Sequence, residues 1–256
     1  MKLRFPSAAG IFGLAIGKTF HQLNPGKSLA ILDSGSTLGG VWAKQRLYPG
    51  LKTNNMLGTF EYPDFPLDTE TFGVKPGEHM SGEVMYKYLT KYAEKFGIID
   101  KIRYQSAVLT AEHQDGADGG WVLTVQSDDT QRQIFARKLV IAAGLTSEPF
   151  LPHIEGQEEF GAPIYHIKDF VNYADTLDSA KSVTVFGGTK SAWDVVYAYA
   201  SKGIKVNWVI RGRTCPRLVF REPKLTCLCS RERPRSRVDG SPIRNTVEEV
   251  AREARP

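Results

Sequence analysis

The chain has 256 residues, 41% of them hydrophobic, so it is long enough to bury the core of one or two domains. Its net charge of +5 arises near the C-terminus, because residues 211–256 carry 12 Lys and Arg against 6 Asp and Glu, and the rest carries 21 against 22. A neutral body argues against a nucleic-acid-binding surface on the fold. No apolar run approaches the ~18 residues of a membrane span.

The three cysteines, Cys215, Cys227 and Cys229, all lie in the basic C-terminal part. Their spacing matches neither a redox-active pair nor a zinc site, and all five histidines precede them. We therefore expect no metal site, and a flavin reductase that works through a cysteine pair is disfavoured. A body without cysteines gives no sign of an oxidising compartment, so we expect a cytoplasmic protein.

The N-terminal residues support two interpretations. Two basic residues followed by an apolar stretch are typical of a signal peptide. Residues 8–13, however, read AAGIFG, a dinucleotide-binding fingerprint whose first glycine has become alanine, and a helical pattern follows. A strand over residues 28–32 then ends in Asp33, 20 residues after Gly13, where a carboxylate binds an adenosine ribose. This second coincidence favours nucleotide binding over secretion, with Gly10 and Gly13 beside the pyrophosphate.

Residues 34–80 form an irregular segment rich in glycine, proline and aromatic residues, which in a compact domain is usually functional or disordered. It contains, in order, Gly-Gly-x-Trp at 39–42, Thr-Asn at 53–54 and Pro-Asp-Phe-Pro at 63–66. The fingerprint, the acidic strand end and these three motifs, in this order, resemble flavin-containing monooxygenases and their Baeyer–Villiger relatives. A proline-rich surface loop would explain the composition but not the ordered set.

The middle of the chain predicts a helix and a small sheet. Ser81 is a candidate N-cap, apolar residues recur on one helical face from 84 to 96, and Gly97 ends the helix. Residues 101–137 alternate in strand fashion between turn motifs, which predicts an antiparallel meander. Residues 139–143 predict an apolar strand, and in the resembled family a comparable strand returns the chain to the flavin sheet.

Residues 160–170 resemble the linker signature of the same family, F-x-G-x-x-x-H-x-x-x followed by an aromatic residue, at every fixed position except Ala162. The segment lies between the two predicted nucleotide-binding units, where that linker belongs. A lone histidine is more often a core or linker residue than a catalyst. We therefore interpret His166 as a linker and gating residue rather than an acid or base.

A second fingerprint lies in a predicted strand–helix–strand unit over residues 183–210. It reads GGTKSA over residues 187–192, with threonine at the middle glycine, and the apolar residues that follow recur at helical spacing. Arg211, rather than an acidic residue, follows the second strand, which favours NADP over NAD because arginine suits a 2′-phosphate. A plain crossover with a surface arginine is the alternative, and this stretch alone leaves the two even.

These patterns predict an α/β fold with two Rossmann-like dinucleotide-binding units, in the three-layer ββα arrangement of flavoproteins, the second unit being incomplete. Residues 1–155 would form the FAD-binding domain and 156–213 a partial NADP-binding domain. Residues 214–256 would be a disordered basic tail, since they show no sustained apolar period. Because the resembled family continues well beyond residue 213, the chain corresponds to a C-terminally truncated member.

The resemblance implies an FAD-dependent monooxygenase that uses NADPH and oxygen, through a flavin hydroperoxide, to oxygenate a small organic molecule. Gly10, Gly13 and the start of their helix would hold the FAD pyrophosphate, and Asp33 would hold the ribose. Gly40 and Trp42 would lie near the isoalloxazine ring.

The resemblance also assigns a catalytic residue and the NADP site. Asn54 matches the family asparagine whose amide donates to the reduced flavin or its oxygen adduct. Gly187, Ser191 and Ala192 would hold the NADP pyrophosphate, and Arg211 its 2′-phosphate. We expect no nucleic-acid partner and no membrane span, and a small molecule as the substrate.

The alternative function is a non-catalytic remnant of such an enzyme that binds at most one nucleotide. Ala8 and Thr189 each place a side chain at a glycine position of a fingerprint, where the backbone should approach a phosphate. One strand after the second fingerprint is too few to complete a Rossmann sheet. On these grounds we expect weak or no FAD binding by this chain alone. A nucleic-acid role for the basic tail is a more distant alternative.

Overall fold

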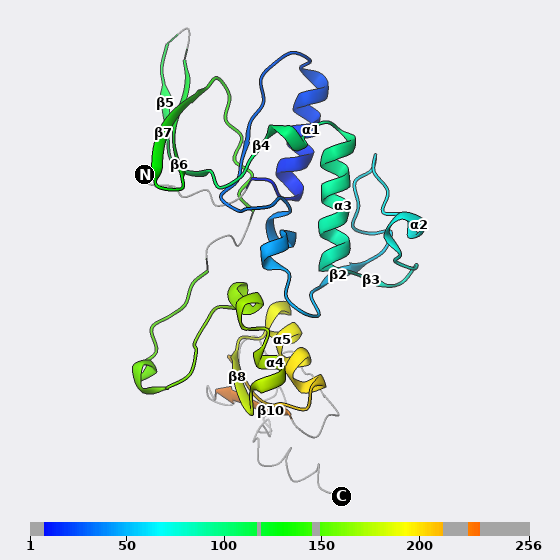
Figure 1. Ribbon diagram of the computed structural model, residues 1–256, viewed down its shortest axis with the longest axis vertical. Helices are drawn as coiled ribbons and strands as arrows, with labels where there is room; N and C mark the ends of the chain where they lie inside the picture. Colours follow the sequence, from blue (N-terminus) through cyan, green and yellow to red (C-terminus); the bar gives the residue numbers. More distant parts are fainter. Residues whose placement is uncertain (1–7, 117–118, 145–148, 212–224, 231–256) are drawn as a thin grey trace, which may run out of the picture. The chain divides into compact units, whose positions relative to one another are not determined.

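The computed structural model describes residues 8–116, 119–144, 149–211 and 225–230 (Figure 1). The chain divides after Val171 into two units. Helices and strands occur in both, which confirms the predicted α/β class. The domain boundary predicted after residue 155 concerns cofactor binding and stays a prediction.

In the first unit, helix α1 (Ile11–Leu23) packs closely on the short strand β1 (Ile31–Leu32). A Cβ atom on Gly17 would lie 2.7 Å from the Ile31 Cδ1 atom, so this approach depends on glycine. Strand β1 pairs in parallel with β4 (Ile102–Arg103), which the sequence assigned to the meander. The strand predicted over residues 28–32 is thus confined to its last two residues.

The irregular segment between β1 and the next long helix is a series of short elements. Strands β2 and β3 pair in antiparallel fashion with a bulge, Lys52 lying opposite Ser81. The elements of this segment are η1 (Gly40–Trp42), η2 (Lys44–Arg46), β2 (Lys52–Met56), α2 (Thr69–Phe72) and β3 (His79–Ser81). Their shortness explains why the sequence showed little periodicity here.

Helix α3 (Gly82–Lys95) begins and ends close to the predicted positions. The Ser81 hydroxyl accepts a hydrogen bond from the Val84 amide at 3.3 Å, which confirms the predicted N-cap. After the helix, Gly97 has a φ of +64°, the left-handed conformation that favours glycine at a helix end. The buried face of α3 comprises Met85, Tyr88, Leu89, Tyr92 and Ala93.

An aromatic cluster packs residues 62–72 against α3. Its members are Tyr62, Phe65, Phe72, Tyr88, Tyr92 and Phe96. The Tyr62 and Tyr92 rings stack with their centroids 4.0 Å apart, and the Tyr88 hydroxyl donates to the Phe65 carbonyl at 2.6 Å. Burial of the rings and these polar contacts together order the proline-containing loop.

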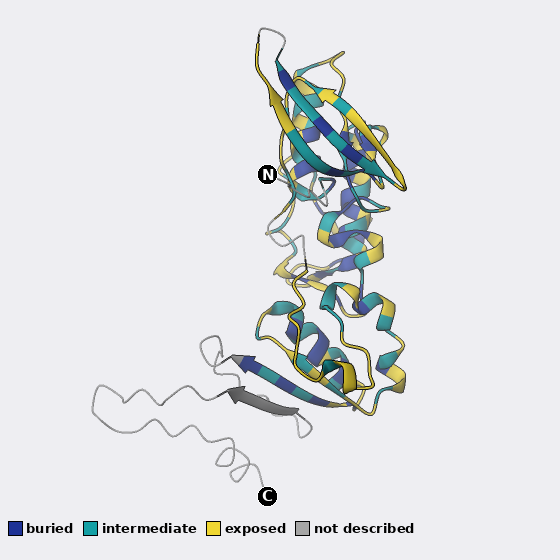
Figure 2. Ribbon diagram, turned by 90° about the vertical axis from the view of Figure 1, so that its left-hand side faces the viewer, coloured by how far each residue is buried: buried dark blue, intermediate teal, exposed yellow. Residues whose placement is uncertain are grey.

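The predicted meander is confirmed as a three-stranded antiparallel sheet of β5 (Ala107–Gln114), β6 (Gly120–Ser127) and β7 (Thr130–Ala136). Its core is formed by Val108, Leu123 and Val125. Figure 2 shows buried residues along β6 and exposed residues along much of β7. This alternation is typical of a sheet with one face on a core and one in water.

The strand predicted over residues 139–143 is wrong, because the chain there is extended without strand pairing. Val140 and Ile141 are 58% and 57% exposed. Ala142 nevertheless comes near α1, since its Cβ atom lies 3.5 Å from where a Cβ on Gly13 would be. The segment therefore lies near the nucleotide-binding turn but does not join the sheet, which contains only β1 and β4 among the described residues.

The end of the first unit includes two 3-10 helices, η4 (Gln157–Glu159) and η5 (Ile167–Tyr173), the second reaching into the next unit. Phe170 is fully buried, with its ring centroid 5.7 Å from that of Tyr48. His166 precedes η5, and its Nδ1 atom accepts a hydrogen bond from the Lys168 amide at 3.1 Å.

The second unit confirms the predicted strand–helix–strand pattern. Its sheet is parallel with the order β10-β9-β8, and α5 packs against β8 and β9. The elements are α4 (Thr176–Ser179), β8 (Ser182–Phe186), α5 (Lys190–Ser201), β9 (Lys205–Arg211) and β10 (Leu225–Ser230).

Strand β10 lies inside the segment for which the sequence predicts disorder. It pairs with β9 along six residues, from Leu225 opposite Val206 to Ser230 opposite Arg211. The free edge of a parallel strand offers backbone donors and acceptors that a further segment satisfies, whatever its composition. The rest of the predicted basic tail, residues 214–224 and 231–256, lies outside the described residues.

The aromatic cluster predicts a pH limit for the first unit. Burial raises the pKa of Tyr88 and of Tyr92 to about 12, from an ordinary value of 10.0. A phenol with a raised pKa in the folded state favours folding fully below its unfolded pKa, and this contribution is lost as the pH rises from about 10 through about 12. We expect the free energy of unfolding to fall over that range. Tyrosinate absorbance that titrates completely near pH 10 in the folded protein would contradict this.

Candidate nucleotide-binding site

The first fingerprint forms a turn at the N-terminus of α1. Gly10 is the N-cap and supplies no side-chain cap, so the helix begins without a side-chain acceptor for its first amides. The first amides of a helix have no carbonyl partner within it, and the helix dipole makes that end positive. A 13-residue helix that begins this way offers a site for an anion such as a pyrophosphate.

Gly13 brings this helix against the backbone that precedes it. A Cβ atom at position 13 would lie 1.6 Å from the Ala8 carbonyl oxygen, a distance that no side chain tolerates. The last glycine of the fingerprint is therefore required for close packing. Ala8, which replaces the first glycine, is partly exposed and is accommodated in this turn.

Asp33 lies beside the same turn. Its side chain is 1% exposed, its Oδ2 atom accepts a hydrogen bond from the Ala9 amide at 2.8 Å, and its Oδ1 atom accepts one from the Gly35 amide at 2.7 Å. Two backbone amides therefore hold the Asp33 carboxylate at this turn. The structure thus joins the acidic strand end to the fingerprint.

The Gly-Gly-x-Trp motif completes this group. The Gly39 amide donates to the Ala9 carbonyl at 2.8 Å, and the Gly40 Cα atom lies 3.5 Å from where a Cβ on Gly10 would be. Gly39 has a φ of +117°, and a Cβ there would lie 2.8 Å from the Ala43 amide nitrogen, so both conformation and space require glycine. Trp42, at the end of η1, is buried. We call Gly10, Gly13, Asp33, Gly39 and Gly40 the glycine cluster.

Arg46 is a further candidate nucleotide-binding residue, which the sequence motifs did not indicate. Its Nη1 atom donates to the Gly40 carbonyl at 3.4 Å. Burial lowers the pKa of Arg46 and the Asp33 charge opposes that shift, but an arginine stays protonated at neutral pH. It therefore places a positive charge beside the glycine cluster. The signal in the sequence is a single arginine four residues after the motif tryptophan.

Asn54 is not brought into contact with the glycine cluster among the described residues. It lies on β2 with an exposed side chain, next to the buried Thr53. The Thr53 hydroxyl donates to the Asn55 carbonyl at 2.6 Å and accepts from the Met80 amide at 3.1 Å. The strand therefore anchors through Thr53 and leaves the Asn54 amide to solvent.

The second fingerprint forms the turn between β8 and α5. Gly187 has a φ of +124°, and its amide donates to the Val209 carbonyl at 2.9 Å. The indole N–H of Trp208 donates to the Gly187 carbonyl at 2.6 Å, and that of Trp193 donates to the Gly188 carbonyl at 3.4 Å. Two tryptophans therefore fix the orientation of this turn.

The remaining predicted residues of the NADP site surround this turn. Thr189 is the N-cap of α5, has extended backbone and makes no side-chain cap. Ser191 is partly exposed and Ala192 is buried, its Cβ atom 3.8 Å from where a Cβ on Gly187 would be. Arg211 is the last residue of β9, and its side chain lies outside the described part of the structure.

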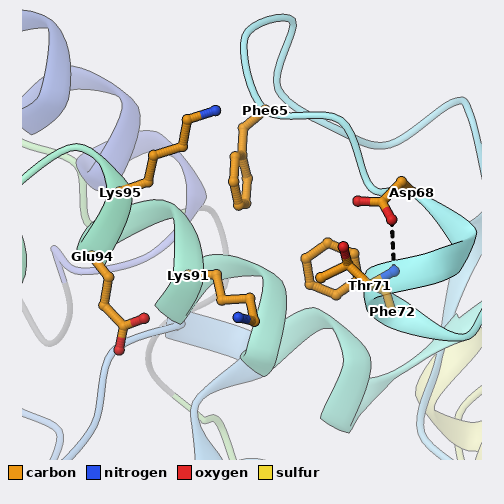
Figure 3. Close-up of a pocket in the computed structure, with 7 residues that line it drawn as sticks. All are labelled: Phe65, Asp68, Thr71, Phe72, Lys91, Glu94 and Lys95. Carbon is orange, nitrogen blue, oxygen red and sulfur yellow. Dashed lines mark hydrogen bonds between the residues drawn. The ribbon is translucent and has the colours of Figure 1, made fainter.

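A shallow cavity of about 340 Å³ lies elsewhere in the first unit, between α2 and α3 (Figure 3). It is lined by Phe65, Asp68, Thr71, Phe72, Lys91, Glu94 and Lys95. Asp68 caps α2 by accepting from the Thr71 amide at 2.6 Å, and no predicted nucleotide-binding residue lines the cavity.

The described residues contain neither a metal site nor a membrane-spanning helix. No cluster of histidine, cysteine and acidic side chains there has the arrangement of a metal site. None of the helices there combines the length and the apolar character that crossing a membrane requires.

Comparison with known proteins assigns the chain to a family. Residues 8–224 match the family described as pyridine nucleotide-disulphide oxidoreductase, a range that contains both fingerprints. The chain belongs to this family. All three cysteines follow residue 214, so neither fingerprint has a cysteine beside it in the sequence.

Among curated relatives, the chain is 37% identical over 213 residues to the FAD-dependent monooxygenase rstn6 of Aspergillus nomiae and 39% identical over 213 residues to an FAD-dependent monooxygenase of Pyrenophora dematioidea. Each alignment covers 79% of this chain but only 36% and 38% of the relative. The chain therefore spans little more than a third of the length of these relatives. The predicted resemblance to flavin monooxygenases is confirmed.

Solved structures show the same fold. Tmm from Pelagibacter sp. strain HTCC7211 superposes with a TM-score of 0.72 at 22% identity, covering 92% of this chain and 57% of that one. A steroid monooxygenase bound to NADP superposes with a TM-score of 0.66 at 24% identity, covering 80% and 38%. At these identities the likeness establishes the architecture and leaves the chemistry of this chain to its own residues.

Replacing Asp33 tests whether its carboxylate holds the glycine cluster together. Asp33→Asn keeps the size but leaves one acceptor oxygen, so the amide of Ala9 or of Gly35 loses its partner in a buried place. We expect a loss of about 1–3 kcal/mol in the free energy of unfolding, measured by denaturant titration. The control is Asp100→Asn, which removes an exposed carboxylate paired with Lys101 and should change stability by less than about 0.5 kcal/mol. Equal effects of the two substitutions would contradict the assignment.

Proposed function

We propose that the chain carries the nucleotide-binding parts of an FAD- and NADPH-dependent monooxygenase that acts on a small organic molecule. One observation carries the proposal. The Asp33 carboxylate and the Gly39 amide both bond to Ala9, at the N-terminus of a 13-residue helix whose close packing requires Gly13. A ribose-binding acid, a phosphate-binding helix end and a glycine turn are the three parts that a dinucleotide needs.

Residues of the glycine cluster and their neighbours Trp42 and Arg46 have separate roles in this proposal. The amides that follow Gly10 would bind the FAD diphosphate, and Asp33 would accept from the adenosine ribose. Gly40 and Trp42 would lie beside the isoalloxazine ring. Arg46 would add a positive charge that offsets the diphosphate.

The second fingerprint would bind NADPH in the same manner. Gly187, Ser191 and Ala192 would hold its diphosphate, and Arg211 its 2′-phosphate. The exposed amide of Asn54 is available to donate to the flavin system once the cofactor is bound. Bound FAD would supply the redox chemistry, and the protein would hold the two cofactors and exclude water.

The sequence and the comparisons also support an electron acceptor, a cellular location and a class of substrate for this activity. The family description includes disulphide chemistry, but residues 1–214 contain no cysteine, so the proposed electron acceptor is the flavin with oxygen rather than a protein disulphide. A body without cysteines is consistent with a cytoplasmic location. The curated relatives are named monooxygenases, which supports a small-molecule substrate rather than a macromolecular one.

A second candidate function is nucleotide binding without catalysis. It is supported by the short parallel pair in the first unit, two residues on β1 against two on β4. It is also supported by Phe186, which ends β8 at the edge of the second sheet and is 66% exposed. A chain of this kind would bind FAD or NADPH and would show no oxygen consumption.

Flavin titration and oxygen uptake test the two candidates. For the monooxygenase we expect quenching of FAD fluorescence on binding and oxygen uptake that requires both FAD and NADPH, a result that would overturn the weak or absent FAD binding expected from the sequence. Gly13→Val should abolish FAD binding, because its side chain enters the space of the Ala8 carbonyl. Gly26→Asn serves as the control, since Gly26 has no neighbour within 4 Å and asparagine tolerates its left-handed φ of +81°. FAD binding without oxygen uptake identifies the non-catalytic function. Absence of both flavin binding and uptake refutes the proposal.

A further inference from the structure

The Pro-Asp-Phe-Pro motif and the tyrosine before it touch α1 at two places. The Tyr62 hydroxyl donates to the carbonyl of Ile11, the first residue of α1, at 2.5 Å. Asp64 forms an ion pair with Lys18, about two turns further along the same helix. One contact is therefore at the end of α1 that carries the fingerprint, and the other is remote from it.

The position of the Tyr62 hydroxyl is set by helix α3. The Tyr62 ring stacks on Tyr92, and the Tyr62 amide donates to the Tyr88 hydroxyl at 2.6 Å. Tyr88 and Tyr92 are 1% and 2% exposed on the buried face of α3. Helices α1 and α3 lie side by side in Figure 1 and are in contact. The hydroxyl is thus a rigid donor that α3 presents to the start of α1.

A donor on this carbonyl orients the helix end without obstructing it. The Ile11 carbonyl and the Phe12 amide belong to one trans peptide, so they point in opposite directions. A bond to the carbonyl therefore fixes the plane of the peptide and leaves the amide available for an anion. Gly10 gives the helix no side-chain cap, so the first turn lacks the usual local stabilisation at this end.

We propose that Tyr62 is a positioning residue for the diphosphate of the bound nucleotide, because its hydroxyl holds the first turn of α1 with its amides facing the ligand. This inference rests on the proposed function. Burial raises the pKa of Tyr62, so the hydroxyl stays protonated and remains a donor throughout the neutral range. Neither the fingerprint nor the Pro-Asp-Phe-Pro motif contains this residue.

Two matched substitutions in the full chain test the proposal. Tyr62→Phe removes the hydroxyl and keeps the stacked ring, whereas Asp64→Asn removes the remote ion pair. Hydrogen exchange of the amides of residues 14–16 reports opening of the first turn of α1 without any ligand. Titrations with FAD, ADP and adenosine report binding, since ADP carries a diphosphate and adenosine carries only the ribose that Asp33 would hold.

For Tyr62→Phe we expect exchange of these amides to accelerate and FAD and ADP affinity to fall, each by roughly three- to tenfold, with adenosine affinity unchanged. Asp64→Asn should change each quantity by less than about twofold, as expected for an exposed ion pair. Unchanged exchange in Tyr62→Phe, an equal loss of adenosine and ADP affinity, or equal effects of the two substitutions would overturn the inference. Failure of the unmodified chain to bind any of the three ligands refutes the proposed function instead, and exchange then decides whether Tyr62 holds the helix.

Discussion

The hydrogen bond between the Ala9 amide and the Asp33 carboxylate is the contact on which the first unit depends. It ties the start of α1 to the end of β1, two elements that also pack closely where the Ile31 side chain meets Gly17. A buried carboxylate is costly unless its oxygens are bonded, and the amides of Ala9 and Gly35 meet that requirement. Asp33 therefore stabilises the turn in the absence of ligand, and in the proposed function the same side chain would bind the ribose.

Much of this arrangement was predictable from the sequence, because the signals are local. Apolar spacing predicts helices α1, α3 and α5. Ser81 predicts the start of α3 and Gly97 its end. The glycine cluster follows from one fingerprint and one acidic residue at a fixed distance along the chain. This spacing corresponds to a fixed backbone geometry. At Gly13 the helix packs on the preceding backbone, and no side chain fits there.

The features that escaped prediction depend on partners far along the chain. Residues 139–143 have the composition of a strand, but a strand also needs a neighbour, and these residues pair with no strand among the described residues. Strand β10 is the opposite case. Its composition indicates disorder, but it forms a strand because it pairs with the edge of β9. Periodicity places Tyr88 and Tyr92 in the core, yet it carries no information on the hydroxyl of Tyr62, whose partner lies 51 residues away.

In both glycine turns an aromatic side chain donates a hydrogen bond to a backbone carbonyl, but the side chains differ. In the first, Tyr62 donates to the Ile11 carbonyl, and in the second, Trp208 and Trp193 donate to the carbonyls of Gly187 and Gly188. In a trans peptide the following amide points away from the bonded carbonyl. Aromatic donors on the carbonyl side therefore hold both turns while leaving amides exposed on the other side. This arrangement suits a site whose ligand is an anion, because an acceptor side chain that capped the amides would compete with the ligand.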